Sequence, residues 1–286
     1  MSDIRYDGRV AIITGAGGGL GKTYALMLAS RGAKIVVNDL GGKPDGSGAS
    51  HSMADDVVNE IKAGGGEAIA NYDSVSTLAG GEAITKAAVD AFGRVDIVIN
   101  NAGILRDKTF AKMTDDDLRA VINVHLEGAF YVTMPAFRVM KENNYGRIVV
   151  TASAAGIFGN FGQTNYGAAK MGLVGLSNVL AVEGLKNNIK SNVIAPIAKT
   201  RMTEQLLGPL ADSVLPTQVT PLVAYLVSEQ CELTHEVFSV GGGRFARVFV
   251  GLAPGWFAGK GEVPTQEAVR AHMDEIRNPE GYTIPA

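Results

Sequence analysis

Short apolar runs alternate along the chain with longer stretches in which apolar residues recur every three or four positions. The first run, Val10 to Thr14 (VAIIT), is β-branched and is followed by glycine, as expected of a fully buried strand. The same pattern predicts seven strands, at 10–14, 34–38, 67–72, 95–99, 146–153, 191–195 and 236–240. Strands that alternate with helical stretches in this way predict an α/β fold with a doubly wound parallel sheet.

The turn after the first strand is rich in glycine. It runs from Gly15 to Gly21 (GAGGGLG) and leads directly into an amphipathic stretch at 22–30. Glycine at the start of a helix lets backbone N–H groups approach a pyrophosphate, and the helix dipole favours the negative charge. Because a strand and a helix flank this turn, the sequence predicts a dinucleotide-binding site here.

Asp39 ends the second predicted strand. A carboxylate at this place accepts hydrogen bonds from the adenosine ribose and repels a 2′-phosphate, which favours NAD over NADP. The alternative is a turn or capping role for Asp39. Lys43, in the long Gly/Ser-rich loop 41–52, is the one signal that opposes the preference for NAD.

Polar residues also follow the third and fourth predicted strands. Asp73 comes after the third and is a candidate contact for adenine, and Asn100 to Gly103 (NNAG) come after the fourth. Ligands bind at the carboxyl ends of the strands in open parallel sheets. These residues therefore extend the predicted site along one edge of the sheet.

A long helix is predicted to begin after Thr114, because Thr114 and Asp117 have the spacing of a capping box. Asn123 lies inside this helix, where an amide is mildly unfavourable, so it is either exposed or held for a purpose. His125 is interpreted as a histidine at the core edge or the surface. The four histidines are scattered and match no zinc-binding spacing.

The segment from Ser153 to Lys170 carries the candidate chemistry. Tyr166 and Lys170 are four residues apart and lie on one face of a predicted helix at 166–183. An ammonium beside a phenol lowers the pKa of the phenol, which could then exchange a proton with a substrate oxygen. Ser153 ends a predicted strand and could hold the same oxygen. A solvent-exposed Tyr–Lys pair is the alternative interpretation.

Composition limits the classes of partner. A formal net charge of −3 argues against a nucleic-acid surface, and the single Cys231 excludes a disulfide framework. We expect no membrane span, because no uninterrupted apolar run reaches about 18 residues. The polar N-terminus does not resemble a signal peptide, and YTIPA at the C-terminus is not a peroxisomal address. These features predict a cytoplasmic protein.

The chain continues for 43 residues after the glycines at 241–243. We expect residues 1–243 to form one NAD-binding catalytic domain. Residues 244–286 are expected to form a C-terminal extension that packs on this domain or on a dimer interface. A last helix is predicted between Thr265 and Arg277. The segment from Thr200 to Pro221 has little periodicity and is interpreted as a flap over the substrate.

Five motifs in register resemble the short-chain dehydrogenase/reductase family. They are the glycine turn, the NNAG segment, Asn123, Ser153 and the Tyr166-x-x-x-Lys170 pair. The resemblance implies a Rossmann fold with seven parallel strands, in which Tyr166 is the acid/base, Lys170 its partner, Ser153 orients the substrate oxygen, and Asn123 holds a water near Lys170. It also implies a dinucleotide site formed with Tyr166 and Lys170 by Gly15, Gly19, Leu20, Gly21, Asp39, Asp73, Asn100 and Thr200.

Longer stretches resemble the (3R)-hydroxyacyl-CoA dehydrogenase module of peroxisomal multifunctional enzyme type 2 and its bacterial stand-alone relatives. They are 36–42, 101–113, the GNFGQTNYGAAK stretch and 195–203. Two departures from the wider family, Ile197 and Val240, weaken inference about the substrate pocket. This resemblance implies NAD-dependent interconversion of a (3R)-3-hydroxyacyl-CoA and a 3-ketoacyl-CoA, and a homodimer or homotetramer. Any second step of such a pathway is expected on another chain.

Two alternatives stay open at this stage. One is a dehydrogenase for 17β-hydroxysteroids or steroid side-chain CoA esters, which uses the same chemistry on another small molecule. The other is a dinucleotide-binding regulator without turnover, against which the intact Asn123, Ser153, Tyr166 and Lys170 argue.

Overall fold

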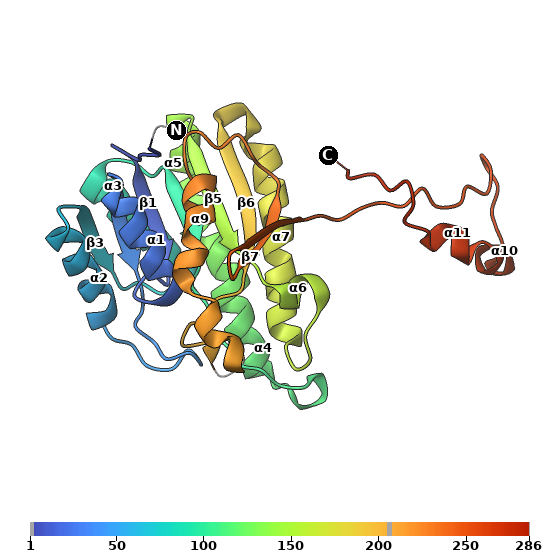
Figure 1. The fold of residues 1–286 in the computed structure, drawn as a ribbon, viewed down its shortest axis with the longest axis horizontal. Helices are drawn as coiled ribbons and strands as arrows, with labels where there is room; N and C mark the ends of the chain where they lie inside the picture. The colour runs from blue at the N-terminus through green and yellow to red at the C-terminus, as the bar shows by residue number, and fades with distance from the viewer. Residues whose placement is uncertain (1–2, 205–207, 286) are drawn as a thin grey trace. The chain divides into compact units, whose positions relative to one another are not determined.

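A computed structural model describes residues 3–204 and 208–285. Its centre is one sheet of eight strands in the order β3-β2-β1-β4-β5-β6-β7-β8. The first seven pair in parallel, which confirms the predicted doubly wound Rossmann fold (Figure 1). The strands are β1 (Val10–Thr14), β2 (Lys34–Asn38), β3 (Glu67–Asn71), β4 (Ile97–Asn100), β5 (Gly146–Thr151), β6 (Ile189–Pro196), β7 (Val237–Gly241) and β8 (Arg244–Val248).

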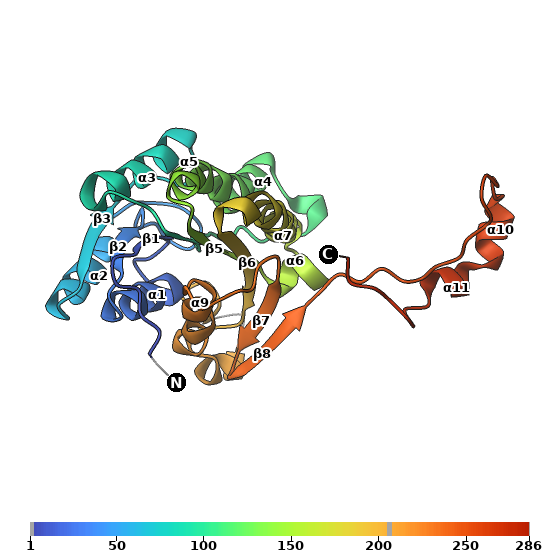
Figure 2. The same ribbon diagram turned by 90° about the horizontal axis from the view of Figure 1, so that it is seen from above.

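Helices cover both faces of the sheet. Figure 2 shows α1, α2 and α9 on one face and α3, α4, α5 and α7 on the other. The bounds of these helices are α1 (Gly19–Ser30), α2 (Ser52–Ala63), α3 (Leu78–Phe92), α4 (Asp115–Ile122), α5 (Gly128–Asn143), α7 (Thr164–Gly184) and α9 (Thr220–Leu226). A short helix, α6 (Ala154–Phe158), follows β5 and was not predicted from the sequence.

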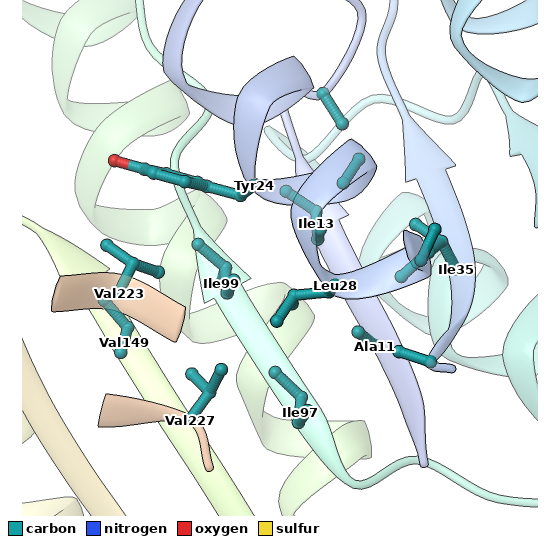
Figure 3. Close-up of a cluster of buried hydrophobic side chains, with 14 of the residues drawn as sticks. Ala11, Ile13, Tyr24, Leu28, Ile35, Ile97, Ile99, Val149, Val223 and Val227 are labelled. Carbon is teal, nitrogen blue, oxygen red and sulfur yellow. The ribbon is translucent and has the colours of Figure 1, made fainter. Parts of the chain in front are cut away.

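Two apolar cores lie against the two faces of the sheet, because successive side chains of a strand point to opposite faces. Ala11 and Ile13 of β1 belong to the core under α1, α2 and α9, whereas Val10 and Ile12 belong to the core under α3, α5 and α7. Figure 3 shows part of the first core, where Tyr24 and Leu28 of α1 lie against side chains of the central strands. Burial of these runs on both faces explains why they read as continuous apolar segments.

The helix that begins after Thr114 is not continuous. The predicted capping box is confirmed, since Thr114 Oγ1 accepts from Asp117 N at 3.1 Å and an Asp117 carboxylate oxygen accepts from Thr114 N. After α4 the chain forms a π-helix, Asn123–Glu127, before α5 begins. Extra residues in a helical turn change which side chains face the core. Phe130 of α5 is 41% exposed, whereas His125 of the π-helix is 3% exposed.

The predicted count of seven strands is corrected to eight. Gly242 and Gly243 both have positive φ, 57° and 78°, and form a two-residue connection between β7 and β8. A connection this short can join only antiparallel strands, and it requires residues that tolerate positive φ at both positions. Residues 244–248, which the sequence analysis assigned to the extension, therefore add a strand to the edge of the sheet.

Contacts divide the chain into two compact units, Met1–Arg247 and Val248–Ala286. Within the second unit, Phe249 stacks on Tyr282 and Trp256 stacks on His272. The predicted last helix occurs as two short helices, α10 (Gln266–Ala271) and α11 (Met273–Arg277), with Thr265 capping the first. Packing of this extension on the catalytic domain or on a dimer interface stays a prediction.

Helix α7 and the turn after it, Thr164–Asn187, form the one candidate membrane span that length and composition allow in the described parts of the chain. The helix instead contacts β5 and β6 and carries the buried side chain of Lys170. Its apolar character is explained by this position in the helical layer.

Candidate active site

A large pocket of about 570 Å³ is lined by residues that follow the carboxyl ends of the central strands. Most of the predicted site residues meet there. Ten of them line it: Gly15, Gly19, Leu20, Asp39, Asp73, Asn123, Ser153, Tyr166, Lys170 and Thr200. The part of the predicted flap at 205–207 lies outside the described residues.

The glycine turn leaves no room for a side chain at its first residue. Gly15 has φ +64° and a Cβ there would lie 2.8 Å from Ala102 Cα. Gly18 is the N-cap of α1, and no side chain caps the helix or places an acidic group in its first turn. The first amide groups of a helix need acceptors from outside the helix. This turn therefore offers N–H donors and a positive helix end to an anionic group.

Two predicted residues are not on the pocket wall. Gly21 is buried, and a Cβ there would lie 2.3 Å from Gly15 O, so its role is close packing of α1 on the turn. The Asn100 amide donates to Thr133 Oγ1 at 2.8 Å in the buried layer behind the strand ends. This arrangement therefore gives the Asn100 side chain no contact with a ligand in the large pocket.

The neighbouring Asn101 lines the pocket, where the sequence analysis had placed it as part of the NNAG segment without giving it a role of its own. Its Nδ2 donates to the backbone oxygens of Thr14 and Gly15, both at 3.1 Å. Thr14 Oγ1 in turn accepts from Asn101 N and Ala102 N. These bonds fasten the end of β4 to the end of β1, and the only sequence signal was an amide directly after a strand.

Asp39 holds the loops on both sides of it. Its Oδ2 accepts from Gly17 N at 2.8 Å, and its Oδ1 accepts from Gly41 N at 2.7 Å. The carboxylate therefore faces the glycine turn while it lines the pocket. The capping role that the sequence left open and the ribose-binding role are compatible, because a carboxylate has about four acceptor sites.

Tyr166 lies near the start of α7, and its backbone N–H donates to Asn165 Oδ1 at 2.8 Å. Burial raises the pKa of the Tyr166 phenol above its usual 10.0, a hydrogen bond with Ser153 opposes the rise, and Asp107 adds to it. The sequence analysis expected Lys170 to lower this pKa. The structure gives the opposite direction, because desolvation of the phenol is the largest influence.

Lys170 is buried and lies at the pocket wall. Its Nζ donates to the backbone oxygen of Thr151 and lies 5.4 Å from the centroid of the Tyr166 ring. Burial lowers the pKa of Lys170 from 10.5 to about 7. Ser153 caps α6 through its Oγ, which accepts from Ala155 N at 3.2 Å.

The π-helix brings two further residues to this place. Asn123, at its start, lines the pocket, and its backbone oxygen accepts from Gly128 N. His125 packs edge to face on Tyr166, with ring centroids 5.1 Å apart. The surface alternative for His125 is wrong, because the residue is buried beside the candidate catalytic pair, whereas a place at the core edge agrees with its position on the pocket wall. A single histidine in a helical stretch of sequence does not indicate that it lies buried beside the catalytic pair.

Comparison with known families decides the identity of the fold and site. The profile of the short-chain dehydrogenases matches residues 9–208. The chain belongs to the short-chain dehydrogenase/reductase family. Members of this family bind a nicotinamide cofactor, and the chain is accordingly a dehydrogenase that acts on alcohol groups.

Individual relatives of this short-chain dehydrogenase are similar over nearly its whole length. A mouse protein named peroxisomal multifunctional enzyme type 2 is 51% identical over 277 residues, which are 96% of this chain and 37% of the mouse protein. A short-chain type dehydrogenase/reductase of Mycobacterium tuberculosis is 52% identical and covers 96% of both chains. This chain therefore spans about a third of the mouse enzyme and nearly all of the mycobacterial one.

Two solved structures are also similar to this chain over nearly its whole length. Full-length peroxisomal multifunctional enzyme type 2 of Drosophila melanogaster superposes with a TM-score of 0.82 at 38% identity, and the match covers 99% of this chain and 48% of the fly chain. A short chain dehydrogenase of Mycobacterium avium also has a TM-score of 0.82, at 39% identity over 96% of this chain and 97% of that one.

The residues present fit the nicotinamide cofactor of the family. The uncapped start of α1 offers donors to a pyrophosphate, and Asp39 offers acceptors to a ribose. The pocket continues from Asp39 to Tyr166 and Lys170, so one elongated ligand could contact both ends.

Proposed function

We propose that this protein interconverts a (3R)-3-hydroxyacyl-CoA and a 3-ketoacyl-CoA, with NAD as the cofactor. The observation that carries the proposal is the meeting of Ser153, Tyr166 and Lys170 in one pocket of a chain that is 51% identical to a multifunctional enzyme. A yeast relative, 53% identical over 247 residues, is named peroxisomal hydratase-dehydrogenase-epimerase. A hydratase produces a hydroxyl group, and a dehydrogenase can oxidise it.

Two residues of the pocket act on the substrate oxygen in different ways. Tyr166 exchanges a proton with that oxygen, and Ser153 orients it by a hydrogen bond. Because burial raises the pKa of Tyr166, the phenol is held protonated at neutral pH, the form that can donate to a ketone oxygen. When bound, the nicotinamide cofactor accepts or supplies the hydride.

Asp39 supports the choice of NAD. Its two carboxylate oxygens are fixed by Gly17 N and Gly41 N, so the charge cannot turn away from the glycine turn without losing both bonds. A 2′-phosphate in that place would be repelled. Lys43 also lines the pocket and is the one nearby cation that the sequence analysis raised against this preference.

The experiment is a substrate panel with the purified protein. It compares kcat/KM for (3R)- and (3S)-3-hydroxyacyl-CoA thioesters and for free 17β-hydroxysteroids, each with NAD and with NADP. The proposal predicts the highest value for the (3R) thioester with NAD. A higher value for a steroid would replace it with the hydroxysteroid alternative, and a higher value for the (3S) thioester would contradict the stereochemistry.

Two further statements stay predictions. Self-association through α7 is supported by its exposed apolar residues Met171, Val179 and Val182. Light scattering measures the resulting mass.

The cytoplasmic location is not supported by the comparisons, because several relatives are named peroxisomal.

A further inference from the structure

His125 is a buried titratable residue in contact with Tyr166 for which the proposed chemistry has no use. Its side chain is 3% exposed and lies between the segment after β4 and the start of α7. Gly103 leaves room for the ring, since a Cβ at Gly103 would lie 2.3 Å from His125 Cε1. Because only glycine fits at position 103 beside the ring, the His125 ring is held in one place.

The two ring nitrogens of His125 have different surroundings. Nε2 lies 3.0 Å from Ile104 N and 2.8 Å from Ile104 O, so it has a partner from the same residue in either neutral tautomer. Nδ1 is buried and has no hydrogen-bond partner among the described residues. An unpaired buried polar atom is unfavourable, so it normally has an ordered water if no side chain reaches it.

A small cavity of about 10 Å³ adjoins this ring. Its lining includes His125 and Lys170 together with the polar residues Thr14 and Asn100. That volume is about the minimum that holds one water molecule, and a buried water needs two to four polar partners. The cavity provides both the size and the partners.

We propose that His125 is a positioning residue that holds, through Nδ1, one buried water shared with Lys170. The inference rests on the proposed function, because it takes Tyr166 and Lys170 as the proton-transfer pair. A water suits either tautomer of His125, since it can donate to Nδ1 or accept from it. The family resemblance assigned the water near Lys170 to Asn123. The backbone oxygen of Asn123 accepts from Gly128 N and keeps a second lone pair, so a water at Asn123 is compatible with the separate water that we place at Nδ1 of His125, which is unpaired among the described residues.

The charge balance of this place supports a neutral imidazole. The ionisable groups that face His125 in the described structure are Lys170 and Tyr166, both from α7. Burial lowers the pKa of His125 well below 6.5, and the charge of Lys170 lowers it further. A neutral ring with a fixed water can hold Lys170 in place without adding a second positive charge.

A crystal structure of the wild-type protein without substrate, at a resolution that shows ordered water, tests the proposal directly. The expected result is one water within hydrogen-bond distance of both His125 Nδ1 and Lys170 Nζ. An empty cavity, or a water that contacts Lys170 alone, overturns the proposal. Neither result depends on which substrate the enzyme uses, so a failure here is separate from a failure of the proposed function.

A matched pair of variants separates the two ring nitrogens. In His125→Asn the amide can reach the place of Nδ1, and in His125→Gln it can reach the place of Nε2. The proposal predicts that kcat falls about tenfold in His125→Gln, with a shifted pH profile of kcat, and changes less than about threefold in His125→Asn. Cofactor affinity, measured by nucleotide fluorescence, should be the same in both.

The reverse order of the two variants overturns the proposal, because it would make the bond to Ile104 the important one. Equal losses in both variants, accompanied by weaker cofactor binding, overturn it as well and indicate a packing role. Melting temperatures of the two variants show whether either change unfolds the protein, and the wild-type crystal structure decides the question in that case.

Discussion

Lys170 Nζ lies 5.4 Å from the centroid of the Tyr166 ring and donates a hydrogen bond to the backbone oxygen of Thr151. The hydrogen bond to the end of β5 thus holds the lysine near the tyrosine ring. Placing an ammonium group in this buried position disfavours its charge, which lowers the pKa of Lys170 to about 7. The burial that prepares the site therefore costs stability.

This cost predicts a pH-dependent effect of Lys170→Met. Between about pH 7 and pH 10.5 the unfolded chain binds a proton at Lys170 that the folded chain does not, so the free energy of unfolding of the wild type rises with pH. The variant lacks this dependence. We expect its melting temperature to exceed that of the wild type by about 3 °C or more at pH 6, and the gap to narrow toward pH 10.

Calorimetry at several pH values measures this gap. Lys86→Met is the control, because Lys86 is exposed and pairs with Asp90 on the surface of α3. We expect the control to show a small difference from the wild type at every pH. A gap for Lys170→Met that stays constant from pH 6 to pH 10 would show that Lys170 is charged in the folded protein throughout.

Asp39→Asn is expected to weaken the discrimination between NAD and NADP. The variant removes the charge that repels a 2′-phosphate, while the amide oxygen can still accept from one of the two glycine N–H groups. The ratio of the dissociation constants for NADPH and NADH should fall by about tenfold or more. Titration of nucleotide fluorescence measures both constants.

Asp45→Asn is the matched control for this charge change. Asp45 lies in the same loop as Lys43, and its carboxylate accepts from Ser47. We expect its ratio of dissociation constants to equal that of the wild type. An equal change in the two variants would mean that net charge near the loop, and not the place of Asp39, sets the preference.

Substitution by alanine should change the free energy of unfolding in opposite directions at two glycines. At Gly21 the new Cβ would meet Gly15 O at 2.3 Å, so Gly21→Ala should lower the free energy of unfolding by about 2 kcal/mol or more. At Gly175, inside α7, nothing lies within 4 Å of the new Cβ, and alanine is the better helix former. Gly175→Ala should therefore stabilise the protein by about 0.5–1 kcal/mol. Denaturant unfolding compares them, and similar losses in both would contradict the packing argument.

The fold could be predicted because its signals are local. Each central strand is a short apolar run buried on both faces, and glycine turns or polar residues mark the strand ends. Strand β8 was missed because the run from Arg244 to Val248 (RFARV) has two arginines within five residues, shows no regular alternation, and lies at the sheet edge. Its partner is reached through Gly242 and Gly243, which the sequence analysis took for the end of the sheet.

The site was predicted less completely, because contacts between distant segments decide it. Spacing placed Tyr166 and Lys170 on one helix face, but it could not give the burial that reverses the expected pKa shift of Tyr166. Asn100 and Asn101 are adjacent in sequence, and only the structure shows that Asn101 lines the large pocket. The inward position of His125 follows from the π-helix, which a regular 3.6-residue pattern does not predict.

The central claim is that the phenol of Tyr166 transfers the proton in an alcohol dehydrogenation. The most direct measurement compares kcat of the wild type and of Tyr166→Phe for NAD reduction with the best substrate of the panel. We predict a loss of about 10²–10⁴-fold in kcat, with the dissociation constant for NADH changed less than about threefold. A variant that reduces NAD at the wild-type rate would contradict the account.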